Sequence, residues 1–310
     1  MKRLLAVLVL SGLSAQAQTI TETFGSGANQ FTIDFVTIGN PGNAADTTGS
    51  PNPVGSVGYI YNLGKYEISR DLINKANNEA GLGIAMRDMS NYGGNGAYRP
   101  ADGVTWYDAV RFVNLLNTSQ GFSAAYKFDS GGNFQLWTAG DVGFNIQNPF
   151  RNKYAKFWLP SIDEWYKGAY GSPGGKWYKF ATGTDEAPIA IPSGTDSNTA
   201  VYAQSASQGP SNVTEAGGLS PWGTMAQNGN VYEWMETAYD GVNDDVGENR
   251  DIRGGYWASD GNLASYVRGS GGLGTGGFGF RVASIPEPSS LSLLLAGGAV
   301  FAAIRRRRSV

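Results

Sequence analysis

Glycine restricts the fold of this chain more than any other residue type does. It accounts for 45 of the 310 residues, about twice the usual share of ~7%, and it interrupts the stretch from 170 to 284 every few residues. Because glycine weakens the interior of helices and strands, long regular elements are not expected there. The chain also has 8 Trp and 16 Tyr, whose large rings can hold a loop-rich fold together. We therefore predict an irregular α+β domain with few helices and many short strands and loops.

Three segments carry the signals of a helix start. Ser69 is placed to cap a helix that ends at Gly81, because a serine side chain can accept a free N–H group of the first turn. Thr105 and Ser161 are placed in the same way, and each is followed three residues later by an acid, as in a capping box. The apolar residues of the second segment share one helical face: Trp106, Ala109, Val110, Val113 and Leu116.

Strands are expected before the first helix. Residues 19–38 alternate loosely between polar and apolar, with three aromatic or aliphatic residues on one face: Phe31, Ile33 and Phe35. Residues 59–68 are predicted to form a strand or hairpin. No internal repeat or long linker interrupts residues 31–284, so we expect one domain there, preceded by an N-terminal segment over 18–30.

The chain contains no cysteine and no histidine. Thiol nucleophiles, Ser-His-Asp relays, zinc sites built on His or Cys, histidine-bound haem and disulfides are therefore excluded. Any chemistry would have to use carboxylates, Tyr, Lys, Arg, amides or a metal held by oxygen atoms alone. We expect no catalytic residues, and we treat enzymatic activity as the less favoured interpretation.

Both ends of the chain carry features of export signals. Residues 1–17, MKRLLAVLVLSGLSAQA, combine a basic start, an apolar run and a small-x-small cleavage site, the three parts of a signal peptide. At the other end, Pro286, Glu287 and Pro288 precede an apolar run over 289–304, and four arginines follow. The run is slightly shorter than the ~20 residues of a bilayer span, and the arginines supply a cytoplasmic stop.

The tail over residues 285–310 resembles the PEP-CTERM sorting signal of Gram-negative bacteria. The resemblance implies the export machinery and an exosortase-type sorting enzyme as partners. It also implies transient anchoring in the inner membrane by the apolar helix, then delivery to the cell surface or extracellular matrix. Whether the tail is removed is left open.

The body of the chain is acidic once the two ends are set apart. Its 17 basic and 25 acidic residues give a net charge of −8, because six of the 23 basic residues and one of the 26 acids lie in the ends. An acidic body argues against nucleic acid as a partner.

Six short blocks occur along the body in a set order: GKYEIS (64–69), GVTWYDAVRFVNLLN (103–117), FWLPSIDEWYKGAYG (157–171), GNVYEW (229–234), IRGGYWA (252–258) and GFGFRVA (277–283). This ordered set resembles the formylglycine-generating enzyme family, or sulfatase-modifying-factor domain, over residues 31–284. By this resemblance the fold is a single irregular α+β domain related to C-type lectins.

The resemblance also shows which family chemistry this chain lacks. Active members hold copper with two cysteines beyond the Arg-Gly-Gly block, and the corresponding positions here are about Ser259 and Ala264. Neither side chain is a soft thiolate ligand, and related sulfoxide synthases need histidines to bind iron. Copper is therefore not expected, and a non-catalytic family member is the preferred interpretation.

The family also carries structural calcium, which implies a candidate calcium site here. Backbone carbonyls of Gly229 and Val231 and the carboxylate of Glu233 would be its ligands, whereas Ala226 stands where an oxygen-bearing side chain is needed. Calcium binds six to eight oxygens, so this departure weakens the site. The alternative for Glu233 is a buried structural carboxylate.

A glycine-rich stretch after residue 253 offers aromatic side chains for ligand binding. Tyr256, Trp257 and Tyr266, with Arg281, are the candidate ligand-binding residues, since rings beside small polar residues suit sugars or peptides. Packing of the rings in the core, and an internal salt bridge for Arg281, are the alternatives. We expect a binding or scaffold module for an exopolysaccharide or a surface protein. A formylglycine-generating oxidoreductase or other enzyme, and a purely structural matrix protein, remain open.

Overall fold

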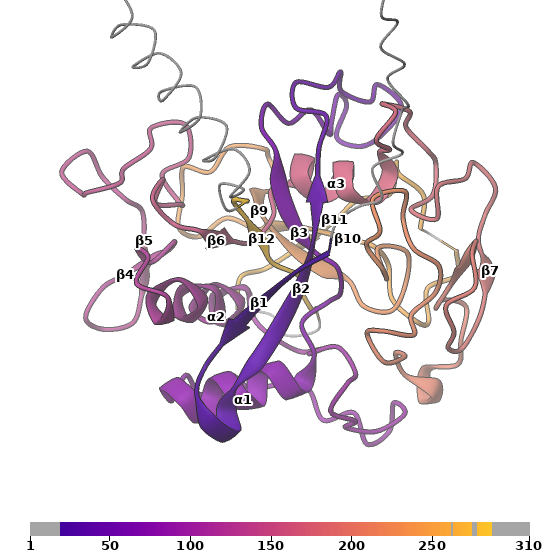
Figure 1. Ribbon diagram of the computed structural model, residues 1–310, viewed down its shortest axis with the longest axis horizontal. Helices are drawn as coiled ribbons and strands as arrows, with labels where there is room; N and C mark the ends of the chain where they lie inside the picture. Colours follow the sequence, from indigo (N-terminus) through magenta and orange to yellow (C-terminus); the bar gives the residue numbers. More distant parts are fainter. Residues whose placement is uncertain (1–18, 262, 275–277, 287–310) are drawn as a thin grey trace, which may run out of the picture.

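A five-stranded antiparallel sheet in the order β1-β2-β3-β12-β6 forms one side of the molecule (Figure 1). Its strands are β1 (Thr19–Phe24), β2 (Phe31–Ile38), β3 (Tyr61–Gly64), β6 (Phe157–Trp158) and β12 (Ala283–Ser284). The last strand of the domain, β12, lies between β3 and β6, which come much earlier in the chain. The two ends of the domain therefore close one sheet.

The structure is a computed structural model that describes residues 19–261, 263–274 and 278–286. The predicted signal peptide, the apolar run over 289–304 and two residues of the sorting motif, Glu287 and Pro288, lie outside these ranges. Across the described residues, no helix is both long enough and apolar enough to cross a membrane.

The N-terminal hairpin confirms the strands expected over residues 19–38. β1 pairs with β2 along its whole length, from Thr19 opposite Val36 to Phe24 opposite Phe31. The predicted inner face of β2 is buried, with Phe35 fully inaccessible. Because β1 comes from the segment 18–30, that segment is continuous with the sheet of the domain. A short 3₁₀ turn, η1 (Gly27–Asn29), connects the two strands.

The three helices begin where their sequence signals predict: α1 (Arg70–Ala80), α2 (Trp106–Ser119) and α3 (Ile162–Tyr170). Ser69 Oγ accepts from the Leu72 N–H, and Gly81 ends α1 in the left-handed conformation at φ 63°. Thr105 caps α2, and Ser161 opens α3 with a complete capping box. The predicted apolar face of α2 is fully buried.

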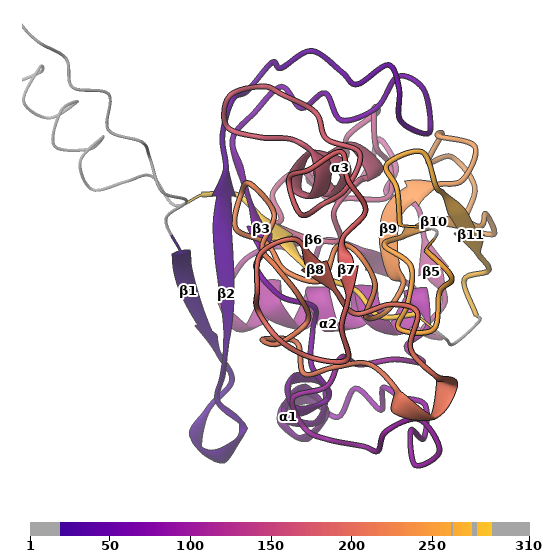
Figure 2. The same ribbon diagram turned by 90° about the vertical axis from the view of Figure 1, so that its right-hand side faces the viewer.

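The second half of the domain is mostly irregular, as the glycine content predicts. Figure 2 shows a three-stranded sheet, β11-β10-β9, facing the five-stranded sheet, with α2 and α3 between them. Its strands are β9 (Glu233–Ala238), β10 (Arg250–Arg253) and β11 (Gly269–Gly271). The remaining elements are short: β4 (Lys127–Phe128), β5 (Phe134–Gln135), β7 (Ile189–Ala190), β8 (Thr199–Ala200) and η2 (Ala206–Gln208).

The segment predicted as a strand or hairpin over 59–68 forms only one short strand, β3. β3 ends at Gly64, although the Lys65 N–H still donates to the Asp34 carbonyl of β2, and the Ile68 N–H donates to the Phe280 carbonyl. The main core lies between the sheets and α2, where aromatic rings pack edge to face, as Trp106 does on Phe134 at 5.1 Å. Three helices and many short strands match the predicted α+β class.

Candidate functional site

The turn at Gly229 and Asn230 begins the block GNVYEW and has a conformation that its residues dictate. Gly229 has φ 87°, and a Cβ there would lie 2.1 Å from the Val201 carbonyl oxygen. Asn230 has φ 61°, its Oδ1 accepts from the Ser211 N–H, and its Nδ2 donates to Glu67. Asparagine tolerates this left-handed conformation better than most residues. Asn230 therefore both forms the turn and ties it to two distant segments.

Glu233, the carboxylate between two aromatic residues, is fully buried in an ion pair with Arg281. Arg281 Nε and Nη2 each donate to one Glu233 oxygen at 2.6 Å, and the Trp165 indole donates at 2.8 Å. The other guanidinium contacts go to the backbone carbonyls of Gly64 and Met225. A planar fork–fork contact of this kind fixes both side chains, so Glu233 joins β9 to the sheet and to α3.

A second buried carboxylate, Glu67, lies close to this pair. It accepts hydrogen bonds from the Asn230 amide and the Val231 N–H. Burial, followed by the charge of Glu233, raises the pKa of Glu67 well above its ordinary value, against the smaller opposing effect of Arg281. The cluster of Glu67, Glu233 and Arg281 thus holds two acids and one base in the interior.

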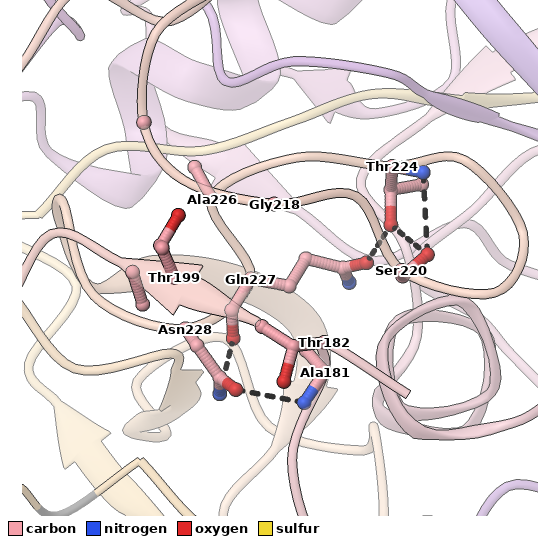
Figure 3. Close-up of a pocket in the computed structure, with 11 residues that line it drawn as sticks. Ala181, Thr182, Thr199, Gly218, Ser220, Thr224, Ala226, Gln227 and Asn228 are labelled. Carbon is pink, nitrogen blue, oxygen red and sulfur yellow. Dashed lines mark hydrogen bonds between the residues drawn. The ribbon is translucent and has the colours of Figure 1, made fainter. Parts of the chain in front are cut away.

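The residues before the turn enclose a cavity of about 10 Å³, room for one water molecule at most (Figure 3). Asn228 Oδ1 accepts from the Ala181 N–H at 2.7 Å, and the Gln227 side-chain amide donates to the Trp165 carbonyl at 3.0 Å. Ala226 is buried and lines the same cavity with a methyl group. These amides support the backbone and leave no space for a small-molecule substrate.

Tyr256 ends a row of packed aromatic rings that runs from the surface into the core. Tyr256 is 37% exposed and stacks on Tyr232 with ring centroids 5.8 Å apart. Tyr232 contacts Phe278 at 6.1 Å, and Phe278 contacts the fully buried Trp234 at 4.7 Å. We call Tyr256, Tyr232 and the adjacent Ser259 the tyrosine platform. Because each ring is held by the next, the platform is rigid.

Ser259 and Ala264, at the positions that the resemblance gives to copper cysteines, are both buried. Ser259 Oγ accepts a hydrogen bond of 2.9 Å from the Tyr256 N–H. Burial raises the pKa of Tyr232, and a hydrogen bond with Ser259 partly offsets this effect. Ala264 packs with Phe180 and other apolar residues beside a cavity of about 10 Å³ that Tyr232 also lines. Ser259 thus supports the tyrosine platform.

The four candidate ligand-binding residues lie in two different settings. Tyr266 is 56% exposed, with the Lys179 ammonium 5.7 Å from its ring centre, and Tyr256 is also accessible. Trp257 is buried, and its indole donates to the Ala206 carbonyl. Arg281 is held in the ion pair with Glu233. Ligand binding by Trp257 or Arg281 would first require these internal contacts to break.

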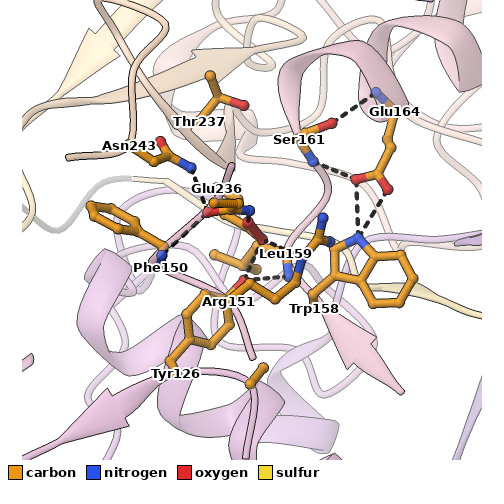
Figure 4. A network of polar contacts seen from close by, with 12 residues as sticks. Tyr126, Phe150, Arg151, Trp158, Leu159, Ser161, Glu164, Glu236, Thr237 and Asn243 are labelled. Atoms are coloured by element: carbon orange, nitrogen blue, oxygen red, sulfur yellow. Dashed lines mark hydrogen bonds and ion pairs between the residues drawn. The ribbon is translucent and has the colours of Figure 1, made fainter. Parts of the chain in front are cut away.

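A polar network around Glu236, which the sequence did not reveal, joins β9 to the start of α3 (Figure 4). Glu236 accepts from the Tyr126 hydroxyl and pairs with Arg151 at 3.5 Å. The Arg151 guanidinium lies 4.5 Å from the ring centre of Trp158, whose indole donates to Glu164. Burial raises the pKa of Glu236, and Arg151 opposes the shift. The members of this network contact one another, so we assign the network a structural role.

Residues 52–285 match the family described as "Sulfatase-modifying factor enzyme 1-like domain". The chain belongs to this family. Residues 284–308 match the PEP-CTERM protein-sorting motif. That motif marks the protein for export, for anchoring through its C-terminus and for processing by an exosortase-type enzyme. The search among curated proteins gave no match.

Solved structures with the same fold cover most of the chain. "Treponema denticola variable protein 1" is 20% identical with a TM-score of 0.57, over 86% of this chain and 99% of that protein. CarF is 18% identical with a TM-score of 0.56, over 82% and 99%. PvdO from Pseudomonas aeruginosa is 17% identical with a TM-score of 0.51, over 86% and 98%. These likenesses support the fold of the sulfatase-modifying-factor family.

The residues at the family's copper position do not fit copper. Ser259 already accepts the Tyr256 N–H, Ala264 has no donor atom, and the space beside Ala264 is about 10 Å³. Copper in such a site needs soft sulfur ligands. No reaction step through copper can be derived for this sulfatase-modifying-factor domain.

The carboxylate at the candidate calcium site is committed to another contact. Both Glu233 oxygens bind Arg281, and Ala226 supplies no side-chain oxygen. Within the described ranges no group of three or more acidic side chains is arranged to hold a metal ion. Calcium needs six to eight oxygens. This arrangement fits the structural alternative for Glu233 better than a calcium ligand, and calcium remains a prediction.

Proposed function

We propose that this exported member of the sulfatase-modifying-factor family is a non-catalytic binding module that holds a polysaccharide or protein through the tyrosine platform. The observation that supports it most is the hydrogen bond from the Tyr256 N–H to Ser259 Oγ. At the position where active relatives place a copper ligand, this chain has a side chain that holds the backbone of an exposed tyrosine.

The physical basis of such binding is preorganisation. A tyrosine loses little conformational entropy on binding, and a ring that is already stacked loses even less. Tyr256 has both properties, because Tyr232 packs on its face and Ser259 holds its backbone. Tyr266 offers a second exposed ring beside the Lys179 ammonium. Export and C-terminal anchoring would bring these rings to surface polymers.

A retention assay on extracellular matrix tests the proposal with the purified full chain. We expect Tyr256→Ala to lower the affinity for matrix roughly tenfold or more, as loss of an interface hot spot does. Tyr154→Ala is the matched control, because Tyr154 is 56% exposed elsewhere on the surface. Wild-type retention in Tyr256→Ala would reject the platform as the binding site.

The catalytic alternative has its own assay. A sulfatase-type peptide that contains the target cysteine is incubated with the protein and copper, and formylglycine is measured by mass spectrometry. We expect no product, because Ser259 and Ala264 supply no thiolate. Formation of formylglycine would overturn the proposal.

A further inference from the structure

An open groove of about 410 Å³ lies between β2 and the start of α1, away from the tyrosine platform. Gln30 and the first residues of β2, up to Asp34, form one wall and the first turns of α1 form the other, with Tyr66, Tyr98 and Thr214 completing it. Figure 1 shows β2 running down to α1 on the side of the molecule that carries β1. The volume falls within the ~300–1,000 Å³ of small-molecule sites, whereas the cavities near the platform hold about one water.

Two tyrosine rings give the groove its apolar surfaces. Tyr98 is 67% exposed, among the most exposed large side chains of the described residues, and its carbonyl is held by the Val213 N–H at 2.9 Å. Tyr66 is half-buried, with the Lys65 ammonium 5.3 Å from its ring centre. An amphipathic ring on a fixed backbone is suited to cover the C–H face of a sugar ring while its hydroxyl stays in water.

Charged groups on both walls can satisfy sugar hydroxyls, which donate and accept hydrogen bonds. Asp71 and Lys75 form an ion pair of 2.8 Å on α1, and each side chain is about one-third exposed. Asp34 Oδ1 accepts from the Thr21 hydroxyl, and no described residue donates to its Oδ2. A carboxylate beside an ammonium offers an acceptor and a donor within the span of one sugar residue.

The net charge of the groove favours neutral sugars over acidic ones. Asp34 and Asp71 outnumber Lys75, so the solvent-facing groups of the groove are net negative. A polysaccharide of uronic acids would meet like charges there, which costs binding energy. A neutral saccharide would meet only hydrogen-bonding partners.

We propose that this groove is a second binding site of the protein, which takes a short segment of a neutral oligosaccharide between Tyr98 and the Asp71–Lys75 pair. The site does not depend on the proposed function, because its lining shares no residue with the tyrosine platform.

The test uses the purified full chain and a glycan array of neutral and uronic-acid oligosaccharides, with each neutral hit measured by isothermal titration calorimetry. We expect neutral hits whose affinity falls roughly tenfold in Tyr98→Ala and is largely kept in Tyr98→Phe, since the ring face does the stacking. The affinity should stay unchanged in Tyr154→Ala. Tyr98 is so exposed that its truncation should leave the fold intact, and circular dichroism checks this.

Each other outcome overturns the proposal. An array without neutral hits, a preference for uronic-acid oligosaccharides, or hits that Tyr98→Ala leaves unchanged would each reject a neutral-sugar groove. Hits that weaken in Tyr256→Ala alone would place glycan binding on the tyrosine platform.

Discussion

Glu233 and Arg281 neutralise each other at a position where neither has exposed surface. Taking either charge from water into the interior is costly, and only the close bidentate contact with its partner offsets that cost. The attraction between the two groups therefore adds little net stability. Its main effect is that neither charge is buried without a partner. Trp165 and the backbone carbonyls complete the hydrogen bonding of the two groups.

This argument predicts that Glu233→Gln lowers the free energy of unfolding by about 3–5 kcal/mol, because the Arg281 charge is left buried and unpaired. Urea denaturation followed by tryptophan fluorescence measures the change. The matched control is Glu186→Gln at an exposed position, which should change stability by no more than ~0.5 kcal/mol. The double variant Glu233→Gln with Arg281→Met should recover part of the loss. A Glu233→Gln variant as stable as Glu186→Gln would contradict the assignment of Glu233 and Arg281 as a buried ion pair.

The residue scale also shows what a sequence can and cannot indicate about a site. The position of Glu233 in its block predicted a carboxylate with a fixed role, but its partner Arg281 lies 48 residues later. The pattern that made Trp257 a candidate ligand contact does not separate an exposed ring from a buried one. Exposure depends on segments such as the one around Ala206, which covers Trp257 and is distant in the sequence.

At the scale of elements, the helices were predictable because their signals are local. Caps, apolar spacing and the terminal glycine of α1 act within a few residues. The strands after residue 180 were not predictable in detail, since most are only two to four residues long and the last one depends on distant partners. β12 pairs with β3 and β6, more than 100 residues away, and two-residue strands leave no alternating pattern to detect.

The caps of α3 and α1 should differ in strength. Ser161 Oγ accepts the Glu164 N–H at 3.2 Å, and the Ser161 N–H donates to Glu164 at 2.7 Å. In α1 the single cap bond from Leu72 to Ser69 is 3.4 Å long. We expect Ser161→Ala to cost about 1 kcal/mol and Ser69→Ala to cost less, both measured by urea denaturation. An equal or reversed order would show that the capping box adds nothing to α3.

For the molecule as a whole, buried acids should make stability depend on pH. Burial raises the pKa of six carboxyl groups: Glu67, Asp102, Asp163, Glu236, Glu248 and Asp251. Above their ordinary pKa values the unfolded chain has released these protons while the folded chain still holds them. The folded state then binds more protons, so stability must fall as pH rises through this window.

We therefore expect a higher free energy of unfolding at about pH 5 than at about pH 7.5. Asp102→Asn should reduce this dependence of stability on pH. Burial has the largest effect on the pKa of Asp102, and Arg87, whose Nε lies 3.4 Å away, opposes that effect only in part. Asp88→Asn is the control. Hydrogen bonds from Ser90 and Asn95 lower the pKa of Asp88 to about 2, so this group affects the pH dependence of stability only at acidic pH. Both pH values lie below the pKa of Lys167, which burial lowers to about 8, so this group contributes little to the difference. A stability that rises between these two pH values would contradict the prediction.

The place of β12 inside the five-stranded sheet has a mechanical consequence for a protein anchored by its C-terminus. A pull on the domain enters through residues 283–286 and reaches β12 first. Ala283 and Ser284 are paired with β3 on one side and with β6 on the other, and the Ile285 N–H adds a bond to the Lys156 carbonyl. A pulling force is thus shared by the hydrogen bonds to both neighbouring strands. An anchored protein under load would resist detachment at the strand that leads to its tether.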